Sequence, residues 1–335
     1  MGGVILIQIS SHWPYIRVQR EQPLTQKAIG WAALITMILA SSTYNVFAKP
    51  LLGALSPFSL LFLSELLTLL FALTSFGLIP IVQHLAGLSR GKILSLLWIG
   101  IMSGTIAPLL WFSGLQATSA VNANLFGNAE MVFLILLAVF VLGERWTKWH
   151  ALAGCTISLG IAIVALRGFR EGFMLFSGDT LILLGSLSFS CGSITFRKYL
   201  HHLPPELAIF VRSVVALSLL LVFFLQHSFF QEIRTFPPAL LPALIGFGFI
   251  ARFLNIFTFY GAIERLPVAT VSLLASLTVV TGTLFAHFSL GEPIFWYHIA
   301  GGILIILGTV LLETVGMHPS EKHLADQLAQ RQHRA

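Results

Sequence analysis

Two apolar stretches decide the fold of this chain: NLFGNAEMVFLILLAVFVLGERWTKWHALAGCTISLGIAIVAL (residues 124–166) and SLLASLTVVTGTLFAHFSLGEPIFWYHIAGGILIILGTVLL (residues 272–312). Each consists of two apolar runs joined by a Leu-Gly-Glu turn, at residues 142–144 and 290–292. Each run approaches the roughly 20 residues that a helix needs to span the hydrocarbon core of a bilayer. The two stretches therefore predict two equivalent pairs of membrane-spanning helices.

The composition of the whole chain also favours a membrane protein. Of 335 residues, 56% are hydrophobic and 10% are charged, whereas soluble globular proteins carry roughly 25% charged residues. A soluble enzyme and a nucleic-acid-binding protein are therefore disfavoured, despite the formal net charge of +6. Cys155 and Cys191 lie inside apolar runs without metal-ligand or disulfide spacing, so we interpret them as packing residues.

Helix-length apolar segments recur along the chain between short polar stretches. A window of about 20 residues identifies ten of them, approximately at residues 28–48, 57–79, 93–115, 119–142, 148–166, 178–199, 206–226, 238–262, 267–289 and 294–314.

These segments form an internal repeat. Pro57 matches Pro205 and Gly30 matches Gly178, each pair 148 residues apart, as are the two Leu-Gly-Glu turns. The sequence therefore predicts five helices in residues 28–166 and five more in residues 178–314, with polar tails at 1–27 and 315–335. Nothing outside the predicted helices suggests an assembly domain. Because five is an odd number, we expect the two repeats to cross the membrane in opposite directions.

The basic residues predict the orientation. With the N-terminus in the cytoplasm, thirteen of the 19 basic residues fall on the cytoplasmic side and four on the outer side. Cytoplasmic loops are enriched in Lys and Arg. We therefore expect an all-α integral membrane protein of the cell inner membrane, with ten helices in two inverted repeats and both termini in the cytoplasm.

Inverted repeats are the architecture of secondary transporters, in which the two halves open one central site to alternate sides of the membrane. The sequence has no HExxH, GxSxG, phosphate-loop or dinucleotide-binding motif. It therefore predicts a transporter of small molecules rather than an enzyme or an ATP-driven pump, with no cofactor, no metal and no nucleic acid partner. A duplicated membrane scaffold without transport is the alternative.

The two opening stretches, together with PFSLLFLSELL (57–67) and PPELAIFVRSVV (204–215), resemble the EamA branch of the drug/metabolite transporter superfamily. The resemblance covers about residues 28–314. It implies ten helices built from two EamA repeats, and a secondary transporter that exports amino acids, other metabolites or drugs by alternating access. An uncoupled facilitator of the same fold is a second interpretation.

Four charges lie inside the predicted helices: Glu65, Glu130, Arg212 and Arg252. A charge at the centre of a bilayer costs about 2.5–3.5 kcal/mol on insertion scales, so each is a candidate functional or structural residue. The helical rise per residue places Glu130 about 16 Å and Arg252 about 21 Å from the outer surface. The two are therefore expected either to pair with each other or to bind cargo.

In the resembled family, helices one, three, four, six, eight and nine surround the central cavity. This implies a cargo-binding role for five residues on those helices: Asn45, Trp111, Glu130, Arg252 and Asn255. Glu130 is also the proton-coupling candidate, and Trp111 is placed to stack on an aromatic or cationic cargo. The alternative for each is a polar residue that only packs helices together.

Glu65 and Arg212 lie on helices that the resemblance places nearer the rim, and we interpret them as gate or structural residues. Glu144 and Glu292 end the Leu-Gly-Glu turns and are expected to cap and fix the hairpins. On a continuous fourth helix, Asn124 and Asn128 face about 140° away from Glu130 at 100° per residue.

Overall fold

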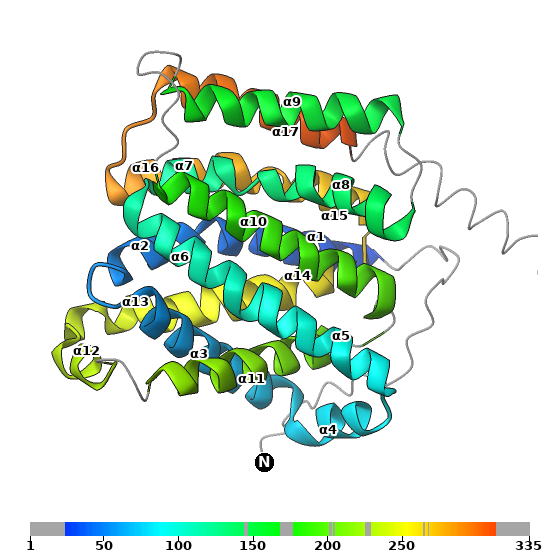
Figure 1. Ribbon diagram of the computed structural model, residues 1–335, viewed down its shortest axis with the longest axis vertical. Coiled ribbons are helices and arrows are strands. Elements are labelled where there is room, and N and C mark those ends of the chain that lie inside the picture. Colours follow the sequence, from blue (N-terminus) through cyan, green and yellow to red (C-terminus); the bar gives the residue numbers. More distant parts are fainter. Residues whose placement is uncertain are drawn as a thin grey trace, which may run out of the picture.

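The computed structural model describes residues 24–143, 147–167, 177–200, 203, 205–224, 229–263, 265–266 and 268–312 (Figure 1). All regular structure in these ranges is helical, and the long helices run side by side across the view in Figure 1. The predicted tails lie outside the described residues, apart from residues 24–27, which begin the first helix.

The first repeat contains, in chain order, α1 Leu24–Ser42, α2 Tyr44–Leu51, α3 Pro57–Phe76, α4 Leu78–Ala86, α5 Arg90–Ile101, the π-helix η1 Met102–Ile106, α6 Ala107–Ala117, α7 Ala120–Phe126, α8 Ala129–Leu142 and α9 Lys148–Ala165.

The second repeat contains α10 Ser177–Thr195, the π-helix η3 Phe196–Leu200, α11 Pro205–Phe224, α12 Phe229–Thr235, the short 3₁₀ helix η4 Pro238–Leu240, α13 Leu241–Gly246, the π-helix η5 Phe247–Leu254, α14 Asn255–Ile263, α15 Val268–Ala275, α16 Thr278–Leu290 and α17 Trp296–Leu311.

Each of the ten predicted segments is helical where it is described, but several are interrupted. The segment 28–48 forms α1 and α2, and 119–142 forms α7 and α8. The third and eighth segments each contain a π-helix, η1 and η5. The short helices α4 and α12 were not predicted; α4 begins directly after Gly77, whose φ of 77° ends α3.

Seven described helices are long and apolar enough to cross a membrane, and two shorter apolar helices follow, Thr278–Leu290 and Trp296–Leu311. Large apolar side chains cover the outside of the bundle. Phe140 is 82% exposed and Phe288, at the equivalent position of the second repeat, is 78% exposed. Such a surface requires an apolar solvent, so the chain is a multi-pass membrane protein.

The glycines of the Leu-Gly-Glu turns explain why that tripeptide occurs in both repeats. Gly143 and Gly291 end α8 and α16 with φ of 69° and 68°. This left-handed conformation is the common end of a helix, and only glycine adopts it without steric cost. The two turns are therefore equivalent in backbone geometry as well as in sequence.

Helix packing follows the repeat too. A Cβ on Gly160 of α9 would lie 2.6 Å from the carbonyl oxygen of Gly301 on α17, and one on Gly308 of α17 would lie 2.9 Å from the carbonyl oxygen of Ala153 on α9. These two contacts exchange under the offset of the repeat. In Figure 1, α9 and α17 lie together at one edge of the bundle, where small residues let their backbones approach closely.

A substitution on α9 tests this packing. Because the Cβ of Gly160→Ala has no room against Gly301, we expect the overpacking to cost about 1–3 kcal/mol and to lower the melting temperature of the detergent-solubilised protein. Gly154→Ala on the same helix is the matched control, since its Cβ would meet only Ile135 Cδ1, at 4.0 Å. Equal melting temperatures for the two variants would contradict the close approach.

Candidate functional site

A cavity of about 390 Å³ lies in the middle of the bundle, between helices of both repeats. Its wall comes from α1, α2, η1, α6, α7, α8, α10, α11, η5, α14 and α16. Cavities of roughly 300–1,000 Å³ are typical of sites for small organic molecules. The five predicted cargo-binding residues all line it, and so does Arg212, but Glu65 does not.

Equivalent positions of the two repeats meet in the wall of the cavity. Its lining includes residue pairs at equivalent positions of the two repeats: Ser103 with Ala251, Glu130 with Thr278, and Met131 with Val279. The π-helix η1 corresponds to the second half of η5, so both walls are also locally widened helices. Single-turn π segments in α-helices are frequent at functional sites.

A chain of hydrogen bonds crosses one wall. Trp111 Nε1 donates to Asn45 Oδ1 over 2.9 Å, and Asn45 Nδ2 donates to Asn124 Oδ1 over 2.7 Å. The Nδ2 of Asn124 is buried and has no acceptor among the described residues. Asn45 and Trp111 therefore orient each other, and the Nδ2 of Asn124 is the donor in this chain that has no acceptor among the described residues.

The position of Asn124 corrects an expectation from helical periodicity. Asn124, Asn128 and Glu130 line the same cavity, although a continuous helix would separate the asparagines from Glu130 by about 140°. The predicted fourth helix is interrupted at Gly127 and Asn128, between α7 and α8. Because the break changes the helical phase, side chains from both pieces point toward one space.

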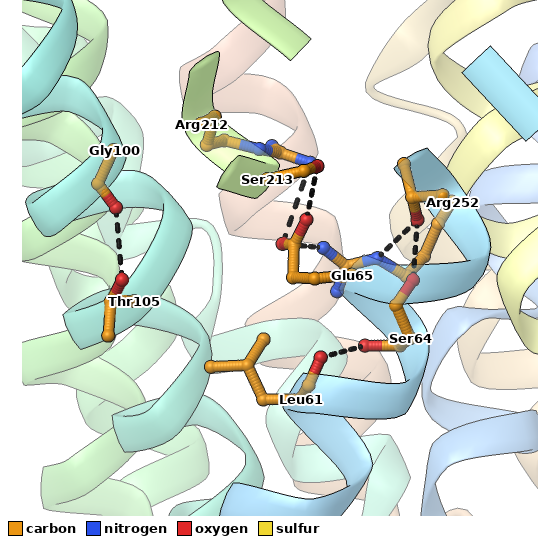
Figure 2. Close-up of polar contacts among 9 residues, drawn as sticks. Leu61, Ser64, Glu65, Gly100, Thr105, Arg212, Ser213 and Arg252 are labelled. Atoms are coloured by element: carbon orange, nitrogen blue, oxygen red, sulfur yellow. Dashed lines mark hydrogen bonds and ion pairs between the residues drawn. The ribbon is translucent and has the colours of Figure 1, made fainter. Parts of the chain in front are cut away.

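Of the two alternatives for Glu130 and Arg252, the structure does not show the ion pair between them: Arg252 pairs with Glu65. Arg252 on η5 is 5% exposed; its Nη2 donates to Glu65 Oε1 on α3 and its Nε donates to Thr68 Oγ1 over 3.2 Å (Figure 2). Glu65 is fully buried, so it lies in the interior rather than at the rim. Depth along single helices did not predict this pair, because it ignores which helices are neighbours.

Glu65 has two further partners, both on α11. Ser213 Oγ donates to Glu65 Oε2 over 2.6 Å, and Arg212 Nη2 lies 3.9 Å from Oε1 (Figure 2). Glu65 and Ser213 are separated by 148 residues, so their hydrogen bond joins equivalent positions of the two repeats. One buried carboxylate thus lies between two guanidinium groups.

The Glu130 carboxylate, on α8, has few polar partners. Its Oε1 accepts a hydrogen bond of 3.3 Å from Ser193 Oγ on α10, and among the described residues it forms no ion pair. Asn255, at the start of α14, lies in the same cavity wall. Glu130 is therefore a carboxylate in the cavity wall that has no cationic partner among the described residues.

Glu292 connects the two repeats away from the cavity. Its carboxylate accepts hydrogen bonds of 2.8 Å from the backbone N–H groups of Ala120 and Val121, the first residues of α7. Since Glu292 belongs to the second repeat, the cap is made across repeats rather than within its own hairpin. Its counterpart Glu144 lies outside the described residues.

Lys49 joins further elements at the end of α6. Its Nζ donates to the backbone carbonyls of Leu115, over 2.6 Å, and of Thr118. Thr118 Oγ1 in turn donates to Asp179 Oδ1 on α10. Cations at the carboxyl end of a helix are favourable because the last carbonyls carry partial negative charge. Polar contacts therefore tie α2, α6 and α10 together at this end of the bundle.

Sequence reasoning missed the hydroxyl groups that hold the charges, namely those of Thr68, Ser193 and Ser213. For Ser213 a signal existed, because it occupies the position equivalent to Glu65. Within the described residues no group of three or more His, Cys, Asp and Glu side chains has the arrangement of a metal site.

Comparisons with known proteins agree with the duplicated helical architecture. Residues 28–166 and 176–314 each match the EamA-like transporter family. A crystal structure of a protein with 20% sequence identity aligns with a TM-score of 0.57, over 87% of this chain and 96% of its own. That likeness concerns the fold alone.

Similar sequences are named as transporters. An uncharacterized transporter of Methanothermobacter thermautotrophicus is 28% identical over 68% of this chain and 66% of its own length. An uncharacterized transporter of Bacillus subtilis is 24% identical over 82% of this chain and 89% of its own. A probable amino-acid metabolite efflux pump of Salmonella typhimurium is 26% identical over 56% of this chain and 64% of its own.

Proposed function

The chain belongs to the EamA-like transporter family, and we propose that it is a secondary transporter that carries a small organic metabolite through the central cavity by alternating access. The observation that carries this proposal is the cavity itself, which is lined by equivalent positions of both repeats. A site lined by equivalent positions is related in the same way to both halves. Exchange of their conformations therefore opens it to either side of the membrane.

The proposed topology has ten membrane-spanning segments. To the seven long apolar helices it adds α11, the pair α15 and α16, and α17. The distribution of basic residues supports cytoplasmic termini. In this orientation the contacts of Lys49 and Glu292 lie at the outer end of the bundle.

The proposed direction is export across the cell inner membrane, and the proposed cargo is an amino acid, a related metabolite or a drug. The support is the family and the name of the Salmonella typhimurium relative, a probable amino-acid metabolite efflux pump. Asn45, Trp111, Glu130, Arg252 and Asn255 form the proposed site. The ring of Trp111 lies edge-on to Tyr44 and Phe189, with centroids 6.5 Å and 6.2 Å away, which gives the site an aromatic wall.

Glu130 is the proposed proton-coupling residue, because it is the cavity carboxylate without an ion pair among the described residues. A carboxylate in an apolar interior is costly when it is charged and much less costly when it is protonated. Binding of a proton or of a cationic group at Glu130 therefore favours different states of the transporter.

Untargeted metabolite profiling tests the proposed function. Medium and cell extracts are compared between cells that overproduce the chain and cells with an empty vector. We expect a small set of metabolites to rise in the medium while their cellular pools fall. Unchanged pools together with a stoichiometric membrane partner would instead identify a scaffold without transport.

A further inference from the structure

Arg212 is a surplus positive charge in the cavity wall. Glu65 is shared by two arginines, but its oxygens are occupied by Arg252 and by the hydroxyl of Ser213. Arg212 reaches only to 3.9 Å of Glu65 Oε1, beyond the 2.7–3.2 Å of an N–H···O hydrogen bond. The group of one acid and two bases therefore keeps a net positive charge, and Arg212 is the cation less well paired.

The two arginines differ in their hydrogen bonds. The guanidinium group of Arg252 donates to Glu65 and Thr68, whereas that of Arg212 donates no hydrogen bond to any described residue, and its buried Nε has no partner. The side chain of Arg212 is 20% exposed, and it lines the central cavity. An arginine with free donors in an apolar interior is costly unless an anion binds it.

We propose that Arg212 is the residue that binds a carboxylate group of the cargo, an inference that rests on the proposed function of the central cavity. A guanidinium group offers paired N–H donors that match the two oxygens of a carboxylate. Arg252 lines the same cavity but is less suited to this role, because its Nε and Nη2 already donate to Thr68 and Glu65.

Gly104 holds the stem of Arg212 in place. A Cβ at Gly104, in η1, would lie 2.6 Å from Arg212 Cγ and 3.0 Å from its carbonyl oxygen. The absence of a side chain at position 104 therefore lets the aliphatic part of Arg212 pack directly on η1. The packing fixes the stem, while the guanidinium group remains without hydrogen-bonded partners among the described residues.

The rest of the cavity defines the class of cargo further. Glu130, on α8, presents the opposite charge, and the unpaired Nδ2 of Asn124 offers a second donor. A cargo with both an amino group and a carboxylate would give Glu130 a cationic partner and give Arg212 and Asn124 an acceptor. Arg212 is therefore a specificity-determining residue of the transporter rather than a gate.

Export assays with Arg212 variants test this inference. The metabolites exported by the wild type are identified by profiling, and the one with the largest increase is used as the probe together with its carboxamide. We expect the exported metabolites to carry a carboxylate. We also expect Arg212→Gln to lower export of the probe at least tenfold and to abolish the preference for the acid over the carboxamide in competition, while Arg212→Lys retains part of both.

A packing variant keeps the test informative if Arg212→Gln does not fold. Gly104→Ala displaces Arg212 without changing its charge, and Gly100→Ala is its matched control. A Cβ at Gly100 crowds the same helix α11, 2.6 Å from Val215 Cβ, but does not meet Arg212. We expect Gly104→Ala to weaken the preference for the acid much more than Gly100→Ala does.

Three outcomes decide between the possibilities. A folded Arg212→Gln variant, or a Gly104→Ala variant, that keeps the wild-type preference for the acid would overturn the role of Arg212. Exported metabolites without a carboxylate would overturn it as well, while leaving the transporter function intact. Absence of any export by the wild type would overturn the proposed function, and the role of Arg212 with it.

Discussion

Glu65→Gln is expected to be recovered only as aggregated or rapidly unfolding protein, whereas Arg252→Gln is expected to fold. The Glu65 carboxylate is fully buried against two guanidinium groups, so removing its charge leaves two cations without an anion. Removing one partner of a buried ion pair costs about 3–5 kcal/mol. In Arg252→Gln the carboxylate remains paired, because Arg212 is within 3.9 Å.

Size-exclusion chromatography and thermal denaturation in detergent measure this asymmetry. Ser213→Ala is the control, since it removes one hydrogen bond to Glu65 and leaves all three charges in place. We expect it to melt between Arg252→Gln and the wild type, or close to the wild type. If Glu65→Gln melts like the wild type, or Arg252→Gln is the less stable of the two, the carboxylate does not hold this part of the bundle together.

The Arg252→Gln variant also links stability to transport. If Arg212 moves to pair with Glu65 in this variant, its guanidinium group is no longer available to cargo. We therefore expect folded Arg252→Gln protein with export reduced as in Arg212→Gln. Wild-type export by the folded variant would mean that Arg212 stays free when Arg252 is absent.

Glu130→Gln is expected to lower export at least tenfold while leaving the protein folded. The only described partner of the carboxylate is Ser193, whose hydroxyl can still donate to the amide oxygen of glutamine. Because no described ion pair is lost, stability should change little. The substitution does remove the negative charge of the cavity and its capacity to bind a proton.

Flux measurements in proteoliposomes at mildly acidic and mildly alkaline pH, with and without an imposed proton gradient, check the role of Glu130. We expect at least a tenfold loss of flux and no response to the gradient, with Ser193→Ala retaining both. A Glu130→Gln flux equal to that of the wild type under all these conditions would exclude Glu130 from coupling. Wild-type flux that ignores the gradient would instead identify an uncoupled facilitator.

Much of the architecture could be predicted from the sequence, because long apolar segments and a repeated Leu-Gly-Glu turn are strong local signals. The turns are explained by the positive φ of Gly143 and Gly291. The breaks between α1 and α2 and between α7 and α8, and the π-helices η1 and η5, were not predicted. They depend on how the helices pack against one another, which hydropathy does not report.

The candidate site could be predicted only in part. All five predicted cargo-binding residues line the cavity. The family resemblance indicated which helices surround it, and polar residues are conspicuous within those apolar helices. The partner of Arg252 was not predictable from depth, since Glu65 and Arg252 lie on helices whose proximity only the tertiary structure reveals. The free donors of Arg212 and Asn124 were equally hidden, because hydrogen bonding of a side chain is not visible in its sequence neighbours.

Counterflow in proteoliposomes tests most directly the central claim that one cavity opens to alternate sides of the membrane. Liposomes with the purified chain are loaded with the unlabelled form of the metabolite identified by profiling, diluted, and supplied with a trace of labelled metabolite outside. A transporter with one alternating site predicts a transient, saturable accumulation of label above its outside concentration, absent in protein-free liposomes. Label that only equilibrates, or does not enter, would contradict alternating access through this cavity.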